Sequence, residues 1–250
     1  MRALVIIAVL ALAGCGEAVD LDRLAAGPRL KIVAAVSGDT VKTADGTEVR
    51  LAGVEAPRAG EAYAEPARAL LQGLVAGQEV ELAYGGARQD PSGRAVAHVR
   101  LTRSRRWLEG ELLRAGAARV RTYGDNRALA ARMLAAEAEA RWAKRGLWAA
   151  PAYEVRLPEE ITPGMRGLQI VEGRVLRAGE ARAIAYLDFA QDWRQGVSVH
   201  VPRAALDDFH LAGRHPLDLQ GRLVRVRGTI REGRVLWIDH PEALEILRER

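Results

Sequence analysis

The sequence is poor in cysteine, lysine, aromatic residues and long apolar runs. Its single cysteine, Cys15, excludes an intramolecular disulfide. Aromatic residues make up only 5% of the chain, which leaves few rings on which nucleic-acid bases could stack. Only Lys31, Lys42 and Lys144 are lysines, so nearly all of the positive charge is arginine. No apolar run reaches the roughly 20 residues that a membrane-spanning helix needs.

The rest of the composition is typical of folded, globular proteins. A chain of 250 residues can form one large domain or two small ones. Hydrophobic residues make up 49% and charged residues 28%, a balance that excludes a wholly disordered chain. The formal net charge of +5 is compatible with an anionic partner. The arginine bias fits phosphate binding and a GC-rich genome equally well.

The first 15 residues have the layout of a bacterial lipoprotein signal. A charged start, Met1–Arg2, precedes the short apolar run 3–13, as in secretory signals. The run ends in Leu-Ala-Gly-Cys, which resembles the box whose cysteine is lipidated and becomes the mature N-terminus. We expect a signal peptide over 1–15 with a lipidated Cys15, and a tether over 16–28. The protein is then exported and lipid-anchored to the cell envelope on the periplasmic side. A buried thiol in a helix is the alternative interpretation of Cys15.

Short β-like runs punctuated by glycine or aspartate begin at Leu30, and Asp45-Gly46 is a typical hairpin turn. After the third run, apolar residues recur at helical spacing over 61–78, and two further helical stretches follow at 107–115 and about 125–144. This succession predicts an α+β domain over 29–150, with a five-stranded barrel of the oligonucleotide/oligosaccharide-binding (OB) type and packed helices. The predicted strands cover 30–36, 40–44, 47–54, 79–84 and 94–101.

A second domain follows a proline-containing stretch. Residues 151–165 contain Pro151, Pro158 and Pro163 without a hydrophobic period, which predicts a linker. Over 166–250 five short β-like runs recur, with a helix-like stretch at 203–210 after the third run. We predict a second, smaller OB-like β-barrel there.

Four charged side chains of the first half are candidates for a metal and phosphate site. Asp39 follows Gly38 in a tight turn and Glu55 ends the third run, so both could give hard oxygen ligands to Ca²⁺ or Mg²⁺. Arg50 alternates with apolar neighbours and is expected to face away from the core. Arg94 follows a Pro-Ser-Gly turn. Two guanidiniums beside a divalent ion would neutralise charge on a phosphate in transit.

Residues 30–148 resemble the staphylococcal-type thermonucleases. The resemblance rests on "SGDTVK", "VRLAGVEAPR", "AYAEPARALL", "DPSGRAVAHV", "LLRAGAARV" and "EAEARWAKRGLW", in this order. It implies a five-stranded barrel with three helices and a Ca²⁺-dependent phosphodiesterase activity. By position, Asp39 matches a metal-binding aspartate of the family, and Arg50 and Arg94 match its two phosphate-clamping arginines. Glu55 matches the second metal carboxylate.

The chain departs from the pattern of that family within the site. Ser37 stands where the family usually has aspartate, and Glu55 is longer than the usual aspartate by one methylene. Arg58 occupies the position of the glutamate that orients or deprotonates the attacking water. A guanidinium has no acceptor and stays protonated, so it cannot do that work. We therefore expect weak or lost hydrolysis, unless Glu61 or Glu65 takes over. Arg58 also adds a positive charge near the ion, so we expect a weakened affinity for Ca²⁺. If the missing base is the main defect, Arg58→Glu should raise cleavage.

Further candidates for nucleic-acid contacts lie outside this cluster. Residues 170–202 and 219–230 resemble the C-terminal module of some exported thermonuclease-like proteins, mainly through "AYLDFAQDW" and "GRLVRVRG". Modules of this type often bind single strands through aromatic and basic side chains. The aromatic residues could equally seal the core of a small barrel. The five histidines show no ligand spacing. The candidates for nucleic-acid contacts are Arg119, Arg121, Tyr123, Arg225 and Arg227, with the aromatic residues Tyr186, Phe189, Trp193 and Trp237.

Three hypotheses follow for the function. The first is a lipid-anchored thermonuclease-like protein that binds nucleic acid or another polyanion, with weak or lost phosphodiesterase activity. The second is an active Ca²⁺-dependent endonuclease. The third is an envelope scaffold whose two barrels bind protein or glycan. The sequence leaves the oligomeric state open.

Overall fold

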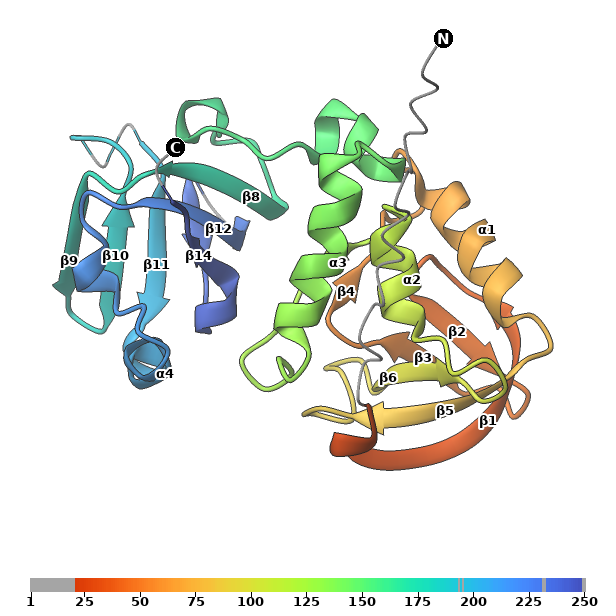
Figure 1. Ribbon diagram of the computed structural model, residues 1–250. Helices are drawn as coiled ribbons and strands as arrows, with labels where there is room; N and C mark the ends of the chain where they lie inside the picture. The colour runs from red at the N-terminus through yellow and green to blue at the C-terminus, as the bar shows by residue number, and fades with distance from the viewer. Residues whose placement is uncertain (1–20, 193, 195, 231–232, 249–250) are drawn as a thin grey trace, which may run out of the picture.

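The described residues form two β-rich domains, the first at the right of Figure 1 and the second at its left. The computed structural model describes residues 21–192, 194, 196–230 and 233–248. Cys15 and the predicted signal peptide lie outside these residues, as does Trp193. No helix in the described ranges is long and apolar enough to cross a bilayer.

The first domain is built on a closed barrel with the strand order β1-β2-β3-β6-β5. β3 and β6 pair in parallel and the other neighbours are antiparallel. Gly46 has a φ of 90° in the turn between β2 and β3, a conformation that glycine adopts without strain. The predicted OB-type barrel is confirmed. Its strands are β1 (Ala25–Ala35), β2 (Thr40–Thr43), β3 (Glu48–Leu51), β5 (Glu79–Tyr84) and β6 (Ala95–Leu101).

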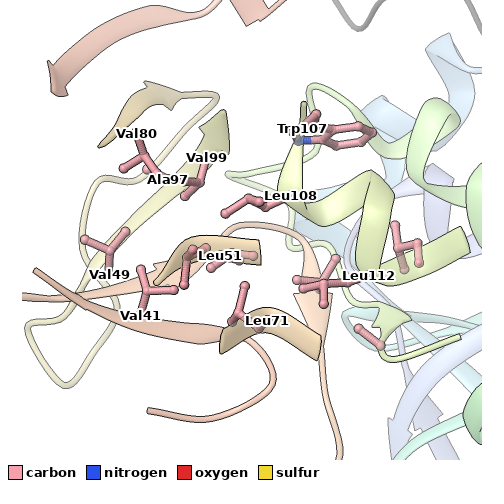
Figure 2. Packing of buried hydrophobic residues seen from close by; sticks show 14 of the residues in the cluster. Val41, Val49, Leu51, Leu71, Val80, Ala97, Val99, Trp107, Leu108 and Leu112 are labelled. Carbon is pink, nitrogen blue, oxygen red and sulfur yellow. The ribbon is translucent and has the colours of Figure 1, made fainter. Parts of the chain in front are cut away.

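Three helices cover the barrel: α1 (Ala64–Val75), α2 (Leu108–Arg114) and α3 (Ala130–Trp142). Their apolar faces close the core, where Leu71 of α1 and Leu112 of α2 lie among strand residues such as Leu51 (Figure 2). These side chains are fully buried, and each such leucine contributes about 2 kcal/mol through the hydrophobic effect. A separate two-stranded sheet, β4 (Val54–Glu55) with β7 (Arg119–Val120), lies beside the barrel.

The second domain contains a seven-stranded sheet. Pairing runs β9-β10-β11-β13-β12, and β12 also pairs with β8 and β14. β11 pairs with β13 in parallel, as β3 pairs with β6 in the first domain. The region predicted as a second, smaller OB-like barrel is thus a seven-stranded sheet that contains one such parallel pair. The elements are β8 (Gly167–Arg174), β9 (Arg177–Ala181), β10 (Ile184–Asp188), β11 (Ser198–Pro202), α4 (Leu206–Leu211), β12 (Leu223–Ile230), β13 (Val235–Trp237) and β14 (Leu244–Ile246).

The described part of the tether belongs to the first domain, so its predicted boundary is wrong. Leu21 is buried, and Ala25 pairs with Tyr84 of β5. The sequence does not predict this start of β1, because apolar and polar residues do not alternate in "DLDRLAAGP" and the stretch contains both glycine and proline.

The predicted linker is also folded. The Tyr153 hydroxyl donates to the Ala62 carbonyl at 2.7 Å, and Ile161 lies in the core of the second domain. Short 3₁₀ helices account for the absence of a hydrophobic period there. The 3₁₀ helices among the described residues are Leu21–Arg23, Gly146–Ala149, Pro151–Tyr153, Pro158–Glu160, Arg203–Ala205, Pro216–Leu219 and Pro241–Ala243.

Polar contacts join the two domains. In Figure 1, α3 is the helix of the first domain that faces β8, β12 and β14. Arg227 of β12 pairs with Glu137 of α3, and Arg127 pairs with Asp208 and Glu242. These contacts place the outer face of the second sheet against the segment 119–123 of the first domain.

Candidate functional site

A cleft of about 380 Å³ on the first domain brings the predicted site residues together. Four of its arginines face two carboxylates, so the cleft is suited to an anion. Sequence positions that span more than 80 residues meet there, because β3 pairs with β6 in the barrel and β4 pairs with β7 beside it. The lining residues are Ser37, Asp39, Arg50, Glu55, Ala56, Pro57, Arg58, Ala59, Arg94, Arg121 and Tyr123.

The turn before β2 fixes the position of Asp39. A Cβ added to Gly38 would lie 2.6 Å from the Cβ of Ala56 and 2.7 Å from that of Ala67, so only glycine allows this close approach. The Ser37 hydroxyl donates to Asp39 Oδ1 at 2.8 Å, and the Ala56 N–H donates to Oδ2 at 3.2 Å. Ser37 therefore supports Asp39, and both carboxylate oxygens already accept hydrogen bonds.

Glu55 is held by two arginines. Glu55 and Arg119 are register partners in the β4–β7 pair, and Arg119 Nη2 lies 3.4 Å from Glu55 Oε1. Arg121 forms a second, short ion pair with Glu55 Oε2. Both arginines point to the same side of the extended segment, because Val120 between them and Ala118 and Thr122 on either side are buried. The carboxylate of Glu55 is therefore neutralised within the first domain.

Arg119 is in turn fixed by the second domain. Its Nη1 donates to the Leu168 carbonyl at 3.0 Å, and its guanidinium lies 5.1 Å from the centre of the Tyr153 ring. Burial lowers the pKa of Arg119, and the nearby Glu137 carboxylate opposes that effect. An arginine stays protonated under such a shift, so Arg119 remains a cation beside Glu55.

Arg50 lies opposite Thr40 on the outward side of β3, as predicted. Neither Arg50 nor the exposed Arg58 has a side-chain hydrogen bond or ion pair to the described residues. The Arg58 N–H donates to Glu61 Oε2 at 2.8 Å, and Glu65 pairs with Arg68. The two glutamates are thus engaged elsewhere, and neither is among the residues that line the cleft.

Arg94 is positioned by the turn that precedes β6. Its Nε and Nη2 each lie 2.8 Å from Asp90 Oδ2, and its N–H donates to Asp90 Oδ1 at 3.0 Å. Burial alone would raise the pKa of Asp90, but these bonds and the Ser92 N–H together lower it. Asp90 remains an anion that aims the Arg94 side chain into the cleft.

The residues of the cleft do not fit a Ca²⁺ site in this conformation. Ca²⁺ takes about six to eight oxygen ligands and prefers anionic ones. The cleft offers Asp39 and Glu55, and Glu55 is bound by Arg119 and Arg121. Within the described ranges no three histidine, cysteine, aspartate or glutamate side chains gather as a metal site would require. Of the two carboxylates predicted to hold the metal, Asp39 accepts hydrogen bonds on both oxygens and Glu55 is paired with two arginines.

The candidates for nucleic-acid contacts divide between two places. Arg121 and Tyr123 line the cleft, with the Arg121 guanidinium 5.6 Å from the Tyr123 ring centre. The assignment of Arg227 to a nucleic-acid surface is wrong, because its side chain is buried against Glu137. Arg225 is half-buried and pairs with Glu172 and Glu245. Of the aromatic candidates, Phe189 is in the core, Tyr186 packs below Arg177, and Trp237 lines a pocket between the domains.

The sequence analysis did not predict the ion pairs of Glu55 with Arg119 and Arg121. The segment 118–122 alternates small or apolar residues with arginine, the period of a strand. That signal could have placed both guanidiniums on one face, but β7 is only two residues long. Its partner β4 is equally short, so their pairing is a tertiary property.

Residues 48–150 match the family model described as staphylococcal nuclease homologue. No curated protein matches the chain. The matched range runs from β3 to the 3₁₀ helix at 146–149 and includes Arg50, Glu55, Arg58 and Arg94, while Asp39 precedes it. Over this range the first domain, with its closed five-stranded barrel and three helices, is similar to staphylococcal nuclease homologues.

Proposed function

We propose that the chain binds the phosphodiester backbone of single-stranded nucleic acid in the cleft of its first domain. One observation carries this proposal: Arg50 and Arg58 enter the cleft without an ion-pair partner among the described residues. Arg94 and Arg121 lie in the same cleft, each with a carboxylate partner. Guanidiniums bind phosphate through paired N–H donors, and the family match supports nucleic acid as the polyanion.

We further propose that hydrolysis is weak or absent. Arg58 stands where the family resemblance implies a glutamate, and it has no acceptor for a proton of water. A general base contributes typically about 10²–10⁴-fold to such a reaction. The pairing of Glu55 with two arginines removes the other carboxylate that could serve. The cleft therefore keeps the arginines that bind phosphate. The carboxylates that could accept a proton from the attacking water are either engaged in other contacts or missing.

The test is the binding of a fluorescent single-stranded oligonucleotide at several salt concentrations. Affinity should fall with rising salt, since phosphates release counterions when arginines neutralise them. Arg50→Ala should lower the affinity and reduce the salt slope by roughly 0.7, the share of one phosphate on a single strand. Arg29→Ala is the matched control, because Arg29 is exposed, pairs with Glu81 and lies outside the cleft.

Other outcomes would favour the other hypotheses. Robust Ca²⁺-dependent cleavage that Arg94→Ala abolishes would establish an active endonuclease. Binding that ignores salt, or no binding at low salt, would favour a scaffold for protein or glycan.

We also propose that the protein is exported and anchored by a lipid on Cys15. The support is the sequence alone, since Cys15 lies outside the described residues. An acyl chain contributes about 0.8 kcal/mol per buried CH₂ to membrane binding. Cys15→Ser should release the protein from the membrane fraction or leave it unprocessed. Unchanged fractionation and processing would contradict the lipoprotein hypothesis.

A further inference from the structure

A pocket of about 420 Å³ lies between the two domains, next to the cleft. The second domain contributes Leu168, Pro202, Thr229 and Trp237, which belong to four neighbouring strands of its sheet. Thr229 pairs in register with both Leu168 and Trp237. The first domain contributes the segment 120–123. The volume lies within the range of roughly 300–1,000 Å³ that is typical of small-ligand pockets.

The pocket and the cleft lie side by side and share two side chains. Arg121 and Tyr123 line both of them. A strand whose phosphates lie on Arg50 and Arg94 therefore reaches the mouth of the pocket when it passes Arg121. The positive charge of the cleft favours the sugar-phosphate backbone of the strand. A group attached to that backbone could then enter the neighbouring pocket.

The chemistry of the pocket suits a flat, mostly apolar ring with polar edges. Trp237 is half-buried, and its ring is held edge-on by His200 with ring centres 5.1 Å apart. Leu168, Pro202 and other apolar side chains form much of the wall. Thr229 and Asp239 supply groups that can hydrogen-bond, and Arg121 and Arg227 also line the pocket. Bases stack on such aromatic side chains in single-strand-binding proteins, and each stacked base contributes substantially to affinity.

The walls of the pocket are held in place by the domain contact. The buried His240 ring lies 2.8 Å from the Thr122 hydroxyl through Nε2 and 2.7 Å from Asp239 Oδ1 through Nδ1. Arg227 Nη1 donates to the Val120 carbonyl at 3.2 Å. A ligand therefore meets a preformed pocket, which lowers the cost of ordering on binding.

We propose that this interdomain pocket binds a nucleobase of the strand whose phosphates lie in the cleft. The inference rests on the proposed function and adds a subsite to it. The second domain then acts as part of the binding site, because Trp237 and Thr229 meet the base. Stacking tolerates every base, so the subsite distinguishes a base-carrying strand from a bare sugar-phosphate chain more than it distinguishes sequences.

The experiment compares two strands of eight nucleotides with equal phosphate counts, oligothymidylate and a fully abasic strand. Wild-type protein is expected to bind oligothymidylate about tenfold more tightly. Trp237→Ala should bring this ratio close to one and leave the abasic affinity unchanged. Trp142→Ala is the matched control, because Trp142 is 84% exposed on α3 and outside the pocket.

A second variant protects the test against misfolding of Trp237→Ala. Thr229→Trp fills the pocket from the neighbouring strand and should also bring the ratio close to one. Equal affinity of the wild type for the two strands, or a ratio that neither variant changes, would overturn the base subsite alone. If neither strand binds the wild type, the proposed phosphate cleft fails together with the subsite.

Discussion

Arg227 of β12 and Glu137 of α3 form a buried ion pair across the domain contact, with Arg227 Nη2 2.7 Å from Glu137 Oε2. Their side chains are 4% and 0% exposed. Glu137 also accepts the Val120 N–H at 2.7 Å, at the end of the strand that carries Arg119. The contact that joins the domains is therefore also the one that fixes β7 beside the cleft.

Removing one partner of this pair should be strongly destabilising. Arg227→Met leaves the Glu137 carboxylate buried with less compensation, and such a loss costs about 3–5 kcal/mol. Urea unfolding should show this decrease in the free energy of unfolding. Arg203→Met is the control, since its ion pair with Glu180 is exposed and should change stability by less than about 1 kcal/mol. A loss below about 1 kcal/mol for Arg227→Met would contradict the importance of the pair.

Arg58→Glu should weaken binding without restoring cleavage. The change places a third carboxylate in a cleft that already contains Asp39 and Glu55, so affinity for single-stranded DNA should fall about tenfold or more at low salt. Sequence reasoning expected a gain of cleavage from this variant, but the structure adds an obstacle, because Glu55 stays paired with Arg119 and Arg121.

Filter binding and a cleavage assay with added Ca²⁺ measure both effects of Arg58→Glu. Lys144→Glu changes the net charge equally at an exposed position outside the cleft. Cleavage by Arg58→Glu alone would mean that Glu55 leaves its arginines when the ion is present.

Asp39→Asn should strengthen the binding of a polyanion. The substitution removes a negative charge from the cleft and keeps one acceptor oxygen for the Ser37 and Thr40 hydroxyls. We expect affinity for single-stranded DNA to rise roughly two- to fivefold at low salt. Asp207→Asn on α4 removes the same charge at an exposed position. Weaker binding by a folded Asp39→Asn protein would show that Asp39 acts through something other than its charge.

Chelation of divalent metals should leave binding intact. The cleft offers phosphate its arginine side chains directly, and these do not depend on a metal. EDTA should therefore change the affinity for single-stranded DNA by less than about twofold, and Ca²⁺ should not raise the thermal midpoint, because a ligand stabilises only the state that it binds. Binding that EDTA abolishes would show that a metal completes the site.

His200 should make the second domain sensitive to mild acid. Burial lowers the pKa of His200 from its ordinary value of 6.5, and the Asp188 carboxylate opposes the effect. Between the lowered value and 6.5 the unfolded chain binds more protons than the folded one, so stability is present above pH 6.5 and falls as pH decreases below it. His200→Gln should flatten this dependence in urea unfolding at about pH 7.5 and 5.5. The exposed His210→Gln is the control, and an unchanged slope in His200→Gln would refute the assignment.

The barrel could be predicted from the sequence because its signals are local. The Asp45-Gly46 turn, the alternation around Arg50 and the helical period of α1 each depend on residues close in sequence. β9 and β14 were missed, since "RAGEA" and "LEI" lack an alternating apolar pattern of useful length. β14 is ordered by its pairing with β12, which is a long-range contact.

The sequence predicts which residues meet in the cleft, but not which of their side chains form ion pairs. Motif positions brought Asp39, Arg50, Glu55, Arg58 and Arg94 to one place, as the cleft has them. The pairing of Glu55 depends on a two-residue strand and on a carbonyl of the second domain that holds Arg119. Side-chain partners of this kind are set by tertiary packing, which a motif does not contain.

The folded segment between the domains affects how the chain can be cut. Proteases cleave a peptide after its surroundings have opened locally, and proline-rich connections are common sites of such cleavage. Here Tyr153 is anchored on the first domain and Ile161 in the core of the second, so this segment opens only when contacts on both sides are lost. Limited digestion is therefore expected to degrade the described chain as a unit instead of releasing two intact halves.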